Sequence, residues 1–196
     1  NGHPDYADLD VDLSSERAVV VGNGNVALDV ARVLAKQADD MQVTEIPDHV
    51  YEGLKSSKVT DVHVFGRRGP AQAKFTPLEL RELGHVADVD VIVYPEDFEF
   101  DEGSMEAIES SNQVKQVAKT LTDFTMREPT GAKRRLHLHF LHAPAEILGD
   151  GKVEGLRTER QELDGTGNVR GTGEFVDWPV QAIYRAVGYA RSEERR

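Results

Sequence analysis

The chain has 196 residues, of which 39% are hydrophobic and 30% are charged, and its formal net charge is −12. It is long enough for one good core and too apolar to be a disordered tail, while its lack of cysteine excludes disulfides and thiolate chemistry and fits a reducing, cytoplasmic compartment. The negative charge makes binding to nucleic acid or to an anionic membrane surface unfavourable, and no apolar run approaches the length of a membrane span.

Strands and helices alternate in the first two thirds of the chain. Residues 17–22 predict a buried strand, because this β-branched run shows no polar alternation. Residues 25–37 predict a helix, because their apolar positions recur at helical spacing. Further elements are expected as a short helix at 49–54, strands at 61–66 and 89–94, a helix at 76–84 and one long helix at 104–126.

Short strands with turn signals follow in the last third of the chain. They are expected within residues 134–147, 152–163 and 173–189, with glycine-rich turns at 149–151 and 164–167 between them. The order of elements predicts an α/β fold. We expect a Rossmann-like three-layer domain, with a parallel βαβαβ sheet and an antiparallel β-meander in the crossover before the last strand.

The turn between the first strand and the first helix contains a phosphate-binding pattern. Gly22, Gly24 and Ala27 fit G-x-G-x-x-G/A, with a strand before the motif and a helix after it. Gly22 would allow the tight turn, Gly24 would let a pyrophosphate approach the backbone, and Ala27 would let the helix pack close to the sheet. The free amides and the dipole at the helix N-terminus favour an anion there. The alternative is a glycine turn that binds nothing.

The end of the second strand indicates which dinucleotide would bind. An NAD site places a carboxylate there to hold the ribose diol, whereas this chain has Arg67 and Arg68. A guanidinium can hydrogen-bond a 2′-phosphate twice and stack on adenine, so the site should prefer NADP(H) to NAD(H). The polar excursion at 39–60 accounts for the long separation from Gly22. The alternative is that both arginines belong to a solvated turn.

Four stretches of the chain carry a family resemblance. They are VGNGNVALDVARVL, VFGRRGPAQAKFTPLELREL, REPTGAKRRLHLHFLHAPAEILG and RAVGYARS. Together they closely resemble the NADP-binding domain of ferredoxin–NADP⁺ reductases of the adrenodoxin reductase type. In that family an FAD domain is built from the two ends of the chain, and the NADP domain is inserted between them. The opening NGHPD also resembles the family's crossover from its FAD domain. The resemblance therefore implies that residues 1–196 are a single NADP(H)-binding domain excised from a longer flavoprotein, with the FAD domain absent.

The resemblance also places the cofactor-binding residues. The resemblance implies that the loop beside the pyrophosphate and the nicotinamide end of the cofactor consists of Gly22, Asn23, Gly24, Asn25 and Val26. Arg67 and Arg68 match the pair that grips the 2′-phosphate.

Two carboxylates, Glu79 and Asp29, lie near this predicted site. Glu79 matches a family carboxylate near the nucleotide, but a capping box with Thr76 would explain it equally well. Asp29 lies one helical turn after Asn25 and is expected to support the loop.

The chemistry that the resemblance implies is hydride transfer from NADPH to a flavin, followed by one-electron transfer to a ferredoxin-type iron–sulfur protein. We expect no catalytic residue in this segment, because the cofactors perform the reaction. The isolated domain should bind NADP(H) without turnover. A stand-alone NADP-binding or sensing module without a redox role is the alternative. A methyltransferase is disfavoured, because it would need an acidic ribose ligand where Arg67 and Arg68 stand.

Three histidines occur in the string LHLHFLH. On one strand, His137 and His139 would share a face and His142 would lie on the other, so we expect them not to converge and predict no metal site. Polar positions on a half-exposed strand are the expected interpretation.

Four basic residues and one tryptophan complete the candidates. Arg127, Lys133, Arg134 and Arg135 form a local basic cluster, which suggests either a docking patch for an acidic partner or a solvated hairpin tip. Trp178 is expected to anchor sheet packing.

Overall fold

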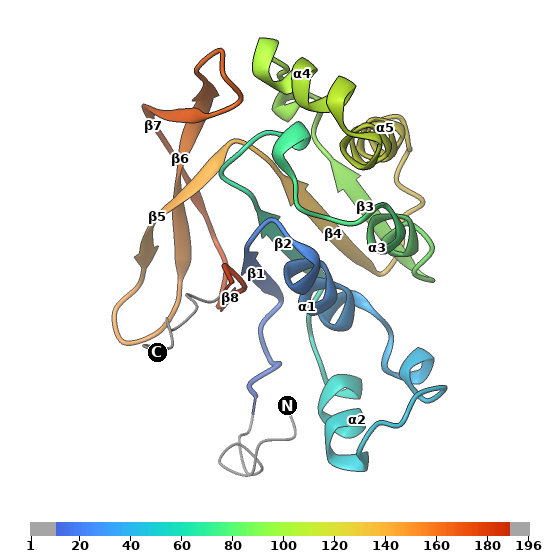
Figure 1. Ribbon diagram of the computed structural model, residues 1–196. Coiled ribbons are helices and arrows are strands. Elements are labelled where there is room, and N and C mark those ends of the chain that lie inside the picture. Colours follow the sequence, from blue (N-terminus) through green and yellow to red (C-terminus); the bar gives the residue numbers. More distant parts are fainter. Residues whose placement is uncertain (1–10, 189–196) are drawn as a thin grey trace, which may run out of the picture.

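The computed structural model describes residues 11–188, so the opening NGHPD and the final YARS of the fourth stretch lie outside the described residues. Five parallel strands form one sheet in the order β3-β4-β2-β1-β8 (Figure 1). They are β1 (Arg17–Val21), β2 (Asp61–Phe65), β3 (Val89–Val93), β4 (Arg134–His139) and β8 (Ala182–Arg185). Because all five strands run the same way, their carboxyl ends meet at one edge of the sheet.

Helices cover one face of this sheet. They are α1 (Asn25–Ala35), α3 (Pro77–Leu83) and α5 (Asn112–Thr125), which share a core with alternate residues of β1, β2 and β4 (Figure 1). The other helical segments are α2 (Asp48–Lys55), α4 (Glu102–Ser110) and three short 3₁₀ turns, η2 (Ala38–Met41), η3 (Pro70–Gln72) and η4 (Pro95–Asp97). In the described part of the chain, no helix has the length and apolar character that a bilayer crossing requires.

An antiparallel meander covers the opposite face. Its strands are β5 (His142–Leu148), β6 (Gly155–Leu163) and β7 (Val169–Trp178). Val19 and Phe65 point from the parallel sheet toward this layer and pack with Leu156 in a second, smaller core. The succession of helices, parallel sheet and meander confirms the expected three-layer α/β fold, with the meander in the connection before the last strand (Figure 1).

The expected long helix at 104–126 is wrong, because the chain breaks at Ser111 into α4 and α5. Ser111 has extended backbone angles, and its hydroxyl accepts a hydrogen bond from the amide of Val114. Asp101 caps α4 in the same way, because its carboxylate accepts from the amide of Ser104. Two residues that favour N-caps therefore begin two helices where apolar spacing alone predicted one.

Candidate functional site

A cavity of about 710 Å³ opens at the carboxyl edge of the parallel sheet, where β1, β2 and β8 end side by side. Its lining comes from the turns that follow these strands, from the loop before α3 and from the start of β5. The residues are Val21, Gly22, Asn23, Gly24, Asn25, Val26, Phe65, Gly66, Arg67, Arg68, Gln72, Lys74, Pro144, Ala186, Val187 and Gly188. The glycine turn and the arginine pair therefore share one cleft.

Gly22 is required by close packing of the backbone. A Cβ atom at this position would lie 2.3 Å from the carbonyl oxygen of Ala186 and 3.1 Å from the Cβ of Ala27. Ala27 is fully buried under the sheet, so helix α1 lies close to the end of β1. Gly24 differs, because a Cβ there would approach only the Cβ of Lys74, at 4.0 Å. The side of the turn at Gly24 is therefore open for a ligand to approach.

Replacing Gly22 with alanine should destabilise the fold by about 2–3 kcal/mol, because β8 must move away from β1 to relieve the clash. Gly53→Ala is the matched control. A Cβ at Gly53, inside α2, meets nothing within 4 Å, so this change should be neutral or slightly stabilising. Urea unfolding of both variants measures the difference. Equal stability of the two variants would contradict the packing role of Gly22.

The start of α1 faces the cavity. The helix begins at Asn25 after Gly24, which provides no side-chain cap. Ala27 and Leu28 donate to the carbonyl of Gly24. The amides of Asn25 and Val26, in contrast, have no hydrogen-bond partner among the described residues. Val26 is 60% exposed and lines the cavity. The Asn25 side chain has a structural task, because its Oδ1 accepts from the backbone amide of Thr76 at 2.8 Å. Asn25 thus holds the N-termini of α1 and α3 together.

Asn23 connects the glycine turn to the loop directly after β2 and to the loop before α3. Its carbonyl accepts a hydrogen bond from the amide of Lys74 at 2.9 Å, and its side chain packs against Gly66. The Oδ1 atom of Asn23 is buried and finds no hydrogen-bond partner among residues 11–188.

Arg67 and Arg68 project from the loop after β2. Arg67 is exposed and Arg68 is half-buried, and within the described residues neither forms an ion pair. Backbone bonds fix this loop, because the carbonyl of Arg68 accepts from Leu141 and the carbonyl of Gly66 accepts from His142. The backbone of both arginines is thus fixed at the cavity, and their guanidinium groups are available to an anion.

The cavity is locally basic in an acidic chain. Its lining contains the cations Arg67, Arg68 and Lys74 and no carboxylate, although the chain has a net charge of −12. Sequence reasoning missed Gln72, Lys74, Pro144 and the stretch 186–188. A signal for 186–188 existed, because loops at the carboxyl ends of neighbouring parallel strands converge.

Glu79 does not line the cavity. Its amide donates to the hydroxyl of Thr76, so Thr76 is the expected N-cap, but the amide of Thr76 donates to Asn25. The expected capping box is therefore only half formed. The Glu79 carboxylate lies 3.6 Å from the guanidinium of Arg32, and Asp29 pairs with the same arginine at 2.8 Å, so Asp29 supports Arg32 and not the glycine loop.

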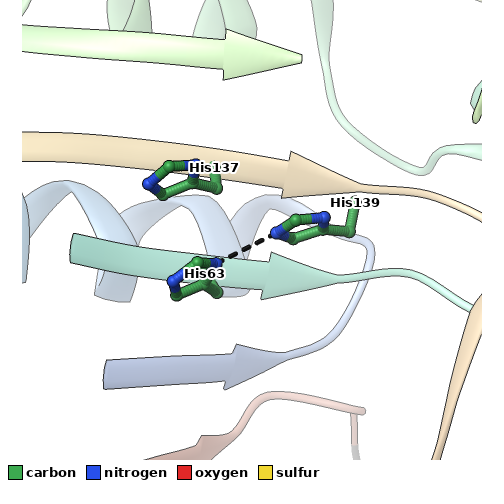
Figure 2. Close-up of side chains that lie close together, drawn as sticks. All are labelled: His63, His137 and His139. Atoms are coloured by element: carbon green, nitrogen blue, oxygen red, sulfur yellow. Dashed lines mark hydrogen bonds between the residues drawn. The ribbon is translucent and has the colours of Figure 1, made fainter. Parts of the chain in front are cut away.

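The expectation that the histidines do not converge and lie on a half-exposed strand is wrong, because one nitrogen each of His63, His137 and His139 lies within 4.8 Å of the others. His137 and His139 lie on β4, which is buried beside β2, and they stack with His63 of β2 (Figure 2). His142 is also buried, and its ring lies 6.1 Å from that of His139. The meander covers this face of the sheet, so these are core positions and not a half-exposed strand. Trp178 packs against His139 and Phe65, which confirms its role as a packing anchor.

The three stacked rings are arranged for packing and hydrogen bonding. His63 Nδ1 and His139 Nε2 are 3.0 Å apart, and the planes of His137 and His139 lie within 20° of that of His63 (Figure 2). Both nitrogens of His137 have partners, because Asp61 lies 2.9 Å from Nε2 and the Tyr94 hydroxyl 2.7 Å from Nδ1. Hydrogen bonds therefore occupy both nitrogens of His137, which makes this group a packing and hydrogen-bonding cluster.

Burial in this layer keeps the histidines neutral. It lowers the pKa of His139 to about 2, that of His63 to about 3 and that of His142 to about 4. The pKa of His137 is also lowered by burial, although Asp61 opposes the shift. At neutral pH these four side chains are therefore uncharged.

The expected basic cluster does not form one patch. Arg134 is buried and donates to the carbonyls of Leu34 and Lys36 at the end of α1, so both interpretations, docking patch and hairpin tip, are wrong for it. Arg135 pairs with Asp61 at 2.7 Å. Hydrogen bonds from Arg135 and His137 lower the pKa of Asp61 to about 2, although burial alone would raise it. Arg127 stacks on Phe124, 4.3 Å from its ring centroid.

Comparisons with known proteins give close relatives. The NADPH-ferredoxin reductase FprA of Mycobacterium tuberculosis is 44% identical over 195 residues, which cover 96% of this chain and 42% of that protein. The mitochondrial NADPH:adrenodoxin oxidoreductase of Arabidopsis thaliana is 34% identical over 202 residues, with the same two coverages. The structure of M. tuberculosis FprA in complex with NADPH superposes with a TM-score of 0.86 at 43% identity, covering 95% of this chain and 42% of that one. No family model matches the chain. The chain thus spans about two fifths of the length of these relatives.

Proposed function

Because this chain is homologous to the adrenodoxin reductase-type ferredoxin–NADP⁺ reductases, we propose that it is their NADP(H)-binding domain and that it binds the nucleotide in the cavity at the carboxyl edge of the sheet. One observation carries the proposal. A glycine turn, a helix N-terminus and three cations without a carboxylate line the same cleft in an otherwise acidic chain.

Each part of the cleft matches one part of the nucleotide. The pyrophosphate would pass the open side of Gly24, where the first amides of α1 and the helix dipole favour an anion. Arg67 and Arg68 would hold the 2′-phosphate, since a planar guanidinium can donate two parallel hydrogen bonds to it.

The whole protein would be an FAD-dependent oxidoreductase. FAD, held by a domain outside this chain, supplies the chemistry that accepts a hydride from NADPH and passes on single electrons. This chain's residues bind the nucleotide and orient its nicotinamide, and none has to act as an acid, base or nucleophile. A ferredoxin-type iron–sulfur protein is the proposed electron acceptor, because the relatives are a ferredoxin reductase and an adrenodoxin oxidoreductase. A cytoplasmic location is part of the proposal and is supported by the lack of cysteine.

Calorimetry of the 196-residue chain with 2′,5′-ADP and with 5′-AMP tests the binding site. We expect 2′,5′-ADP to bind at least tenfold more tightly, which requires about 1.4 kcal/mol from the arginine pair. The chain should not oxidise NADPH when a ferredoxin is added without a flavin. Equal, weak binding of the two adenylates would contradict the NADP(H) site.

A further inference from the structure

We propose that the ammonium group of Lys74 binds the pyrophosphate of the nucleotide, as a third cation whose task differs from that of the arginine pair. The inference rests on the proposed NADP(H) site and names a contact that the sequence pattern did not indicate.

The backbone of Lys74 is fixed beside the glycine turn. Its amide donates to the carbonyl of Asn23 at 2.9 Å, and Lys74 forms an isolated parallel bridge with Gly24. These contacts join the loop before α3 to the start of α1. The Lys74 side chain consequently begins beside Gly24, because its Cβ would lie 4.0 Å from a Cβ placed on Gly24.

The side chain is free to reach the cavity. Lys74 is exposed, lines the cavity, and pairs with no carboxylate among residues 11–188. A lysine acts on phosphate as a compact point charge on a flexible stem, whereas arginine gives a planar fork. A pyrophosphate at Gly24 would present two negative charges within reach of such a group.

The position separates Lys74 from the arginine pair. Arg67 and Arg68 follow the end of β2, where a 2′-phosphate is expected, while Lys74 adjoins Gly24, where a pyrophosphate is expected. The cation at Lys74 should therefore increase affinity for NADP⁺ and NAD⁺ alike. The cations at Arg67 and Arg68 should increase affinity for NADP⁺ alone.

Calorimetry with three ligands tests this division. Lys74→Gln in the 196-residue chain should weaken NADP⁺ and NAD⁺ binding by the same factor, about tenfold. It should leave the affinity for adenosine 2′-monophosphate, which has no phosphate at the 5′ position, unchanged. Lys74→Arg should retain most of the affinity. Lys119→Gln removes the same charge from an exposed position on α5, outside the cavity lining, and should change none of the three.

Two results would overturn the proposal. Unchanged NADP⁺ affinity in Lys74→Gln would show that the ammonium does not touch the nucleotide. An equal loss for NADP⁺ and adenosine 2′-monophosphate would place Lys74 at the 2′-phosphate. Failure of the proposed function is distinguishable from both, because the parent chain would then show no preference for NADP⁺ over NAD⁺. Circular dichroism and the unfolding midpoint check that Lys74→Gln retains the fold.

Discussion

A chain in which Arg67 and Arg68 are both replaced by alanine should bind NADP⁺ no more tightly than NAD⁺. Both guanidinium groups belong to the cavity wall, and neither is neutralised by a described carboxylate. A hydrogen bond to a charged group contributes about 1.5–3 kcal/mol, so losing both is enough to abolish the preference for NADP⁺, which we expect to be at least tenfold. The affinity for NAD⁺ should change little, because this ligand has no 2′-phosphate.

Competition calorimetry of the variant with NADP⁺ and NAD⁺ measures the ratio. The matched control is Lys115→Ala with Lys119→Ala, which removes two positive charges from α5, outside the cavity lining. If this control lowers the ratio as much, the net charge of the chain is responsible. If the arginine variant loses both ligands equally, the pair positions the loop, and if it fails to fold, the pair is structural. Each of these outcomes contradicts direct recognition of the 2′-phosphate.

The parts of the site that the sequence predicts are those that depend on neighbours in the chain. Gly22 and Gly24 lie between a strand and a helix, and Arg67 and Arg68 follow the next strand. In a parallel sheet where these two strands are adjacent, both turns must meet at one edge. Their shared cleft therefore follows from local patterns and one general rule of topology.

The parts that the sequence does not predict depend on strand order. On the side of β2 away from β1, the neighbouring strand is β4, although β3 is the next strand in the chain. This pairing sets His63 opposite His137, and the meander then covers both. The buried contact of Arg134 with the end of α1 likewise joins residues about 100 positions apart. Periodicity along the chain contains no information on such distant pairs.

Acid should destabilise the fold well before its carboxylates titrate. The pKa values of His139, His63 and His142 are about 2, 3 and 4 in the folded chain, below the value of about 6.5 for an exposed histidine. As the pH falls below 6.5, the unfolded chain binds protons that the folded chain does not, so the free energy of unfolding decreases. This stabilisation is therefore present above pH 6.5 and is lost below it.

The loss of folding stability through the histidines is large, and it falls between pH 6.5 and pH 4. Each buried neutral histidine contributes about 1.4 kcal/mol per pH unit below 6.5, or on the order of 2 kcal/mol between pH 7.5 and pH 5. Asp61 has a lowered pKa of about 2, so its contribution is lost only as the pH falls below 3.8. Between pH 6.5 and pH 4 the histidine layer should thus determine the acid response. Three such residues amount to a large part of the stability of an ordinary domain.

Urea unfolding at several pH values between 7.5 and 4.5 measures this slope. His139→Gln removes one of the titrating groups and should reduce the slope by about 1.4 kcal/mol per pH unit, whatever its effect on stability at pH 7.5. His49→Gln, at an exposed position on α2, is the matched control and should leave the slope unchanged. A slope that is identical in His139→Gln and in the parent chain would contradict the buried neutral state.

Bound nucleotide should move the acid transition to lower pH, because a ligand that binds only the folded chain stabilises it at every pH. The carbonyl of His139 accepts from the amide of Gly66, which directly precedes Arg67, and the ring of His139 stacks on Phe65 in the cavity wall. A ligand at a hundred times its Kd stabilises the folded state by about 2.7 kcal/mol, which is close to the contribution of one histidine at pH 5. At a concentration a hundred times its Kd for the parent chain, NADP⁺ should therefore restore about 2.7 kcal/mol at pH 5 in the parent chain and much less in the double arginine variant. If NADP⁺ stabilises both chains equally at that pH, the nucleotide binds away from Arg67 and Arg68.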